Sequence, residues 1–125
     1  MKLLNTYTLE IKKSKFIGYL YEVKSKEEVK SILEELKKEH KKARHIPYAF
    51  ILNSTAGKSD DKEPSGTAGS PIYQVLDRLQ EKNRALFIVR YFGGTKLGAG
   101  GLLRAYAKSA QEVVNLKGKN QENTC

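Results

Sequence analysis

Apolar residues recur along this chain with two different periods, and each change of period marks a change of element. Alternation with period two predicts strands over residues 6–11 and 16–23, joined by the basic turn 12–15. A third strand is predicted over 48–53. The continuous apolar run within 84–91 predicts a fourth strand that is at least partly covered on both faces.

Three helices are predicted between and after these strands. Ser25 and Glu28 form a capping box, which predicts a helix start. Its apolar face is formed by Val29, Ile32, Leu33 and Leu36. Ser70 and Pro71 are typical of a cap and first helical residue. The last helix is predicted over 102–116, after a glycine-rich stretch.

The order strand, strand, helix, strand, helix, strand, helix predicts an α+β domain. We expect two layers, with a four-stranded mixed sheet and the helices on one face. One domain over residues 1–116 accounts for these elements. Residues 117–125 offer no apolar stripe and are predicted to be a disordered tail.

Composition limits the cellular environments and the classes of partner that fit this chain. The 125 residues carry 23 Lys plus Arg against 14 Asp plus Glu, a net charge of +9 that favours polyanions such as RNA or the ribosome. Many lysines lie in mixed-charge stretches, so the charge alone does not establish nucleic acid. Cys125 is the only cysteine, no apolar run reaches the roughly 20 residues of a membrane span, and no signal peptide begins the chain. A cytoplasmic protein without a membrane partner, monomeric or weakly oligomeric, is expected.

The polar stretch 54–70 is longer than most loops of a compact domain, which indicates a functional or a disordered segment. Its carboxylates could hold Mg²⁺, although their spacing matches no known cation loop. They could equally cap the next helix or pair with basic residues, and the hydroxyls could contact a ligand or only shape the turn. The candidate site residues here are Asp60, Asp61, Glu63, Ser65 and Thr67.

Residues 90–104 form a glycine-rich loop between the fourth strand and the last helix. Such a loop can aim backbone N–H groups at an anion, or it can simply let strand and helix pack closely. Its spacing matches neither the P-loop nor the dinucleotide fingerprint. The candidate anion-binding residues are Arg90, Gly93, Gly94, Lys96, Gly98, Gly100, Gly101 and Arg104.

Other catalytic signals are weak. His45 could act as an acid, a base or a ligand, although a lone histidine beside a proline is more often structural. Tyr91, within the aromatic and basic run at the loop's start, could stack on a base. There is no internal cysteine and no G-x-S-x-G motif, and two histidines make a zinc site improbable.

Two long motifs resemble the IMPACT family and its bacterial YigZ-like members. They are the acidic loop 60–69 (DDKEPSGTAG) and the glycine loop 90–106 (RYFGGTKLGAGGLLRAY). Shorter matches occur at 13–17 and 43–49. The resemblance covers about residues 5–115 and corresponds to the family's N-terminal domain.

The resemblance implies the fold of the second domain of ribosomal protein S-five and a cytoplasmic, translation-linked role. Lys62 departs from the family, which usually carries glycine there, and this puts a positive φ at that position in question. Bacterial relatives carry a second, ferredoxin-like domain, so a natural single-domain form and a truncation both fit this chain.

Three functional hypotheses follow. The first is a regulatory binding protein that engages RNA, the ribosome or an acidic protein through the glycine loop. The second is a metal-assisted enzyme on a phosphorylated or nucleotide-like ligand. The third is that the two loops pack on each other and only build the fold. The sequence favours a binding protein over an enzyme and leaves the catalytic residues unassigned.

Overall fold

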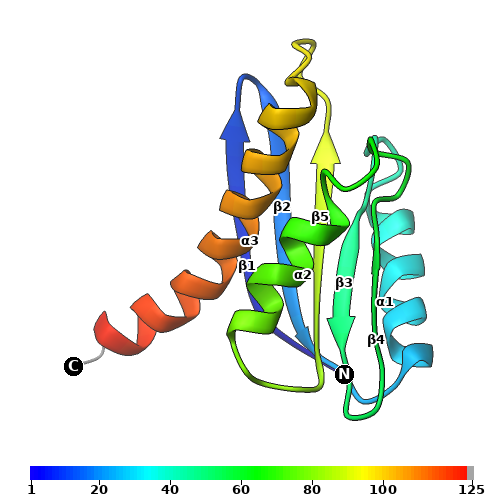
Figure 1. Ribbon diagram of the computed structural model, residues 1–125, viewed down its shortest axis with the longest axis vertical. Helices are drawn as coiled ribbons and strands as arrows, with labels where there is room; N and C mark the ends of the chain where they lie inside the picture. Colours follow the sequence, from blue (N-terminus) through cyan, green and yellow to red (C-terminus); the bar gives the residue numbers. More distant parts are fainter. Residues whose placement is uncertain (124–125) are drawn as a thin grey trace.

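The computed structural model describes the backbone of residues 1–123 and the side chains of residues 1–115. It is an α+β domain in which three helices pack on one sheet (Figure 1). The predicted disordered tail, 117–125, lies outside the described side chains. The elements in chain order are β1 (Lys2–Ile11), β2 (Ser14–Glu22), α1 (Lys26–Glu39), β3 (Tyr48–Ile51), β4 (Ala56–Ser59), α2 (Gly69–Arg78), β5 (Arg84–Tyr91) and α3 (Gly98–Asn123).

The sheet has five strands in the order β1-β2-β5-β3-β4, and every neighbouring pair is antiparallel. The prediction of a four-stranded mixed sheet was therefore wrong on both counts. The missed strand, β4, is four residues long (AGKS) and carries none of the β-branched or aromatic residues that favour strands. Because β5 inserts between β2 and β3, no two parallel strands become neighbours.

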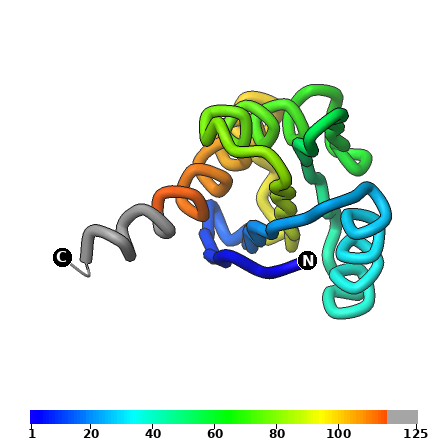
Figure 2. Tube along the Cα trace, turned by 90° about the horizontal axis from the view of Figure 1, so that it is seen from below, coloured from blue at the N-terminus to red at the C-terminus, as the bar shows by residue number. Residues whose placement is uncertain are grey.

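The helices cover both faces of the sheet, which corrects the prediction that they lie on one face. Successive residues of β5 point to opposite faces. Leu86 and Ile88 pack with α2 and α3, whereas Phe87 and Val89 pack with α1. Figure 2 shows α2 and α3 on one side of the strands and α1 on the other. The strongly apolar sequence of β5 follows from this position between two cores.

The two helical crossovers have opposite hands. The first runs from β2 through α1 to β3, and the second runs from β4 through α2 to β5. The strands of the second crossover run opposite to those of the first, and the second crossover also moves the opposite way across the sheet. Rotating the sheet by half a turn about its normal therefore converts one path into the other without exchanging the two faces. Two right-handed crossovers would consequently place both helices on the same face. Because α1 and α2 lie on opposite faces, one crossover is left-handed, against the usual rule.

The β1–β2 hairpin supports the glycine loop. Its two turn residues, Lys12 and Lys13, both have positive φ, as a two-residue primed turn requires. Gly93 lies directly against this turn: a Cβ built at Gly93 would fall 2.1 Å from the carbonyl oxygen of Lys13. The Gly93 N–H also donates to Ser14 Oγ at 3.2 Å. Only glycine allows the loop to approach the hairpin this closely.

Candidate functional site

A buried ion pair joins the acidic loop to the glycine loop. Arg90 Nη1 donates to both carboxylate oxygens of Glu63, at 3.0 and 2.8 Å. The side chains are only 7% and 2% exposed, respectively. Arg90 is the second-last residue of β5, and Glu63 lies in the loop between β4 and α2. The two motifs that the sequence analysis singled out are therefore in direct contact.

Helix α3 contributes a third member of this cluster. The hydroxyl of Tyr106 donates a hydrogen bond to Glu63 Oε2. Burial, and then this hydrogen bond to the carboxylate, raise the pKa of Tyr106 well above its ordinary value. The hydroxyl therefore stays a donor throughout the physiological range. Glu63 thus holds β5 and α3 together through two different partners.

His45 lies at the edge of the same cluster. Its Nδ1 donates to the backbone carbonyl of Asp61 at 2.7 Å, and its Nε2 lies 3.5 Å from Glu63 Oε1. The Asp61 carboxylate accepts a hydrogen bond from the Ile46 N–H at 2.6 Å. These contacts fasten the segment before β3 to the acidic loop. They also fix the orientation of the imidazole ring.

Asp60 caps helix α2 from outside the helix. Its carboxylate accepts from the backbone N–H groups of Gly66, Ala68 and Gly69, at 3.0, 3.2 and 2.8 Å. Burial alone would raise the pKa of Asp60, but the three backbone donors outweigh it and lower the pKa. The predicted cap, Ser70, is instead inside the helix, and its Oγ accepts from Lys58 Nζ.

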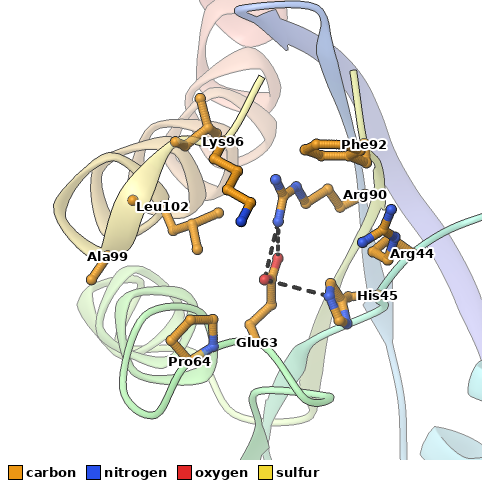
Figure 3. A pocket seen from close by; sticks show the side chains of 11 residues that line it. Arg44, His45, Glu63, Pro64, Arg90, Phe92, Lys96, Ala99 and Leu102 are labelled. Carbon is orange, nitrogen blue, oxygen red and sulfur yellow. Dashed lines mark hydrogen bonds and ion pairs between the residues drawn. The ribbon is translucent and has the colours of Figure 1, made fainter. Parts of the chain in front are cut away.

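The Glu63–Arg90 pair forms the floor of a pocket of about 350 Å³. Figure 3 shows its walls: the acidic loop on one side, the start of α3 on another, and Phe92 with Arg44 on a third. The guanidinium of Arg44 lies 4.7 Å from the centre of the Phe92 ring, a cation–π contact. Lys96 and Gly98 from the glycine loop complete the lining.

The structure divides the predicted anion-binding residues between two places. Arg90, Lys96 and Gly98 line the pocket. Arg104 and Gly101 line a separate groove of about 210 Å³, together with Lys12 and Lys108.

The remaining glycines of the loop have other surroundings. Gly100 faces the Arg104 guanidinium rather than the pocket, and Gly93 packs on the hairpin. Gly94 has a positive φ of 91° and open space where a Cβ would lie.

The remaining candidates lie outside the pocket. The hydroxyl of Thr67 donates to the Pro64 carbonyl at 2.6 Å and shapes the turn, while Ser65 is exposed. The Tyr91 hydroxyl lies 2.7 Å from His40 Nδ1, on the α1 side of the sheet. In the described part of the chain, no three His, Cys, Asp or Glu side chains are grouped so as to hold a metal. A Mg²⁺ ion at the acidic loop therefore stays a prediction without a ligand cluster.

The sequence analysis did not place Arg44 or Tyr106 in the site. Tyr106 lies within the predicted last helix, and a buried tyrosine hydroxyl usually needs a partner. Arg44 lies within the short motif match at 43–49. Its neighbour His45 was a candidate site residue, and this adjacency in sequence was the signal that could have pointed to Arg44.

Comparison with known proteins agrees with the two motifs. The family model described as the Impact N-terminal domain matches residues 12–114. The IMPACT family member YvyE of Bacillus subtilis is 41% identical over 112 residues, which cover 87% of this chain and 52% of YvyE. The IMPACT family member YigZ of Escherichia coli is 37% identical over 114 residues, which cover 87% of this chain and 56% of YigZ. The chain belongs to the IMPACT family.

Solved structures give the same result for the fold. A crystal structure of a hypothetical protein superposes with a TM-score of 0.86 at 36% identity, covering 89% of this chain and 56% of that one. The two-domain translational regulator Yih1 superposes with a TM-score of 0.54 at 22% identity, covering 93% and 46%, which shows a shared fold. The chain spans about half the length of these relatives. No helix in its described part is both long and apolar enough to cross a bilayer.

Proposed function

We propose that this chain is a translation-associated binding module that engages RNA, alone or in the ribosome, through the end of the domain that carries the glycine loop. The observation that carries this proposal is a cluster of exposed basic side chains around the start of α3. Its members, here called the basic end, are Lys12, Lys13, Arg44, Lys96, Arg104 and Lys108.

The basic end is suited to phosphates because its charges are not neutralised within the domain. Among the described side chains, no carboxylate lies within ion-pair distance of any of the six. The nearby carboxylates are already engaged: Glu63 binds Arg90, and Asp60 caps α2. Excess positive charge on one surface attracts a polyanion and steers its approach.

The link to translation rests on the family. Yih1, which shares this fold, is described as a translational regulator. As part of the proposal, we infer that this chain also acts in translation and is cytoplasmic. An RNA-binding surface is compatible with such a role because ribosomes expose RNA backbone.

Fluorescence anisotropy with a labelled single-stranded RNA tests the proposal. The variant Arg104→Ala/Lys108→Ala removes two charges from the basic end. The matched control, Lys26→Ala/Lys30→Ala, removes two exposed charges from α1, whose start lies at the other end of the domain (Figure 1).

The expected result is weaker binding by the first variant only. If both lysine and arginine contact phosphates, the slope of log K against log salt should fall by about 1.4, since each contact on a single strand contributes about 0.7. Equal affinities of the two variants for RNA would mean that RNA binds outside the basic end. Absence of binding to RNA and to ribosomes at low salt would refute the proposal.

A further inference from the structure

The pocket beside the Glu63–Arg90 pair has more positive charge than its own carboxylate can neutralise. Arg44, Arg90 and Lys96 line it, and Glu63 is the one acidic residue in its lining. Both oxygens of Glu63 already accept hydrogen bonds from Arg90, and one also accepts from Tyr106. The positive charges of Arg44 and Lys96 therefore remain available to an anion that enters the pocket.

Arg90 is the strongest indication of a ligand. Its side chain is 7% exposed, yet the hydrogen bonds of this side chain to described residues all use Nη1. Its Nε is buried without a partner, and buried donors normally have one. Figure 3 shows Glu63 at one edge of the guanidinium, while the rest of the group faces Lys96 and Phe92. An acceptor in this space would use donors that Glu63 leaves free.

The start of α3 supplies a second, independent feature. Gly98, at φ 73°, turns the chain into the helix and lines the pocket together with Ala99. The first turn, which begins at Gly98, contains no acidic residue, and no hydrogen bond joins its N–H groups to a described side chain. A helix N-terminus with free N–H groups and no compensating negative charge favours an anion.

We propose that this pocket binds a phosphate monoester, either the 5′-terminal phosphate of an RNA or a free nucleoside monophosphate. A terminal phosphate can enter far enough to reach the nearly buried Arg90, whereas a phosphodiester within a strand carries a sugar on both sides. A phosphate monoester also carries close to two negative charges at neutral pH, which suits the charge excess. The guanidinium of Arg44, held over the Phe92 ring, provides a flat group on which the attached base can stack.

The RNA as source of this phosphate rests on the proposed function, but the pocket's preference for a monoester does not. The test therefore compares two ligand pairs. The first is one RNA sequence with a 5′-phosphate or a 5′-hydroxyl, measured by anisotropy. The second is a nucleoside 5′-monophosphate or the same nucleoside, measured by thermal shift, with inorganic phosphate as a third probe.

The variants are chosen to leave the buried pair intact. Lys96→Ala and Arg44→Ala remove exposed pocket charges, Lys96→Arg is the conservative rescue, and Arg104→Ala is the control in the other groove. We expect the 5′-phosphate to strengthen RNA binding about tenfold, the effect of one charge-assisted contact. Lys96→Ala should bring this ratio close to one, whereas Arg104→Ala should lower both affinities and keep the ratio.

The outcomes separate the two proposals. Equal binding of 5′-phosphate and 5′-hydroxyl RNA, with no shift by the monophosphate, overturns the pocket proposal and leaves RNA engagement standing. A thermal shift by the monophosphate that Lys96→Ala abolishes, without any RNA binding, supports the pocket and refutes RNA engagement. A phosphate preference that survives in Lys96→Ala and Arg44→Ala also overturns the pocket assignment.

Discussion

The Glu63–Arg90 pair allows a sharp test of what burial does to an ion pair. Glu63→Ala leaves the guanidinium of Arg90, 7% exposed, without its counter-charge. Removing one partner of a buried pair typically costs about 3–5 kcal/mol in the free energy of unfolding, because a charge stays buried without compensation. The free energy of unfolding of a whole domain is about 5–15 kcal/mol, so this cost is a large fraction of it.

The chain contains a matched control at the surface. Arg84 Nη2 lies 2.9 Å from Glu81 Oε2, nearly the distance found in the buried pair, but the Glu81 side chain is 44% exposed. Glu81→Ala should therefore cost about 0–1 kcal/mol. The two substitutions remove the same carboxylate from an arginine at nearly the same distance, so the difference between them measures burial together with the loss of the acceptor for Tyr106.

Urea unfolding followed by far-UV circular dichroism suits this protein, which has no tryptophan. The denaturation midpoint should fall strongly for Glu63→Ala with an unchanged m-value, and hardly move for Glu81→Ala. The double variant Glu63→Leu/Arg90→Met should recover much of the loss, because it removes both charges. A loss for Glu63→Ala no larger than that for Glu81→Ala would refute the reasoning.

Two further predictions concern the acidic loop. Asp60→Asn should lower the free energy of unfolding by about 0.5–1.5 kcal/mol at pH 7, because the amide keeps one acceptor oxygen but loses the charge and the second acceptor. Because folding lowers the pKa of Asp60, its contribution is complete above the unfolded pKa and is lost as pH falls through the folded pKa. The gap between Asp60→Asn and wild type in urea titrations should therefore close below about pH 4, and a constant gap would contradict the capping role. Lys62→Gly should raise the thermal midpoint by about 2–4 °C, since Lys62 holds φ 69°. Lys62→Ala should give no gain, and a lower midpoint for Lys62→Gly would contradict the backbone argument.

Sequence patterns were enough for most elements, because β2 and the helix α1 each bury one face, whereas β5 is buried on both faces and shows as a continuous apolar run. The Ser25 capping box did begin α1, with Ser25 Oγ accepting from the Glu28 N–H at 3.2 Å. Strand β4 was not predicted, because its four small or polar residues at the edge of the sheet show no alternation of apolar and polar positions. Periodicity also shows that a helix has an apolar face without showing which side of the sheet it meets. The position of α1 depends on the hand of a crossover, which no local pattern encodes.

The candidate site was predicted in part for a similar reason. Charged residues in unusual loops pointed to Glu63 and Arg90, but their pairing depends on β5 lying beside the acidic loop. Lys62 has a positive φ of 69° although it is not glycine, so the conformation that was in question at this position is present. Arg104 was grouped with Arg90 by proximity in sequence. Arg104 lies two residues after Leu102, which lines the pocket, and two residues rotate a side chain by about 200° around a helix, so Arg104 faces the other groove.

The partners of Glu63 also set an order of assembly. They come from residues 27 and 43 positions further along the chain, Arg90 and Tyr106. During synthesis, Glu63 therefore emerges long before either partner, and its carboxylate stays hydrated until β5 and α3 arrive. The Glu63–Arg90 floor needs only the acidic loop and β5, but the wall formed by the start of α3 is complete only when α3 docks, so a nascent chain that ends before Tyr106 lacks the complete site. Binding at the pocket would then report that folding is finished.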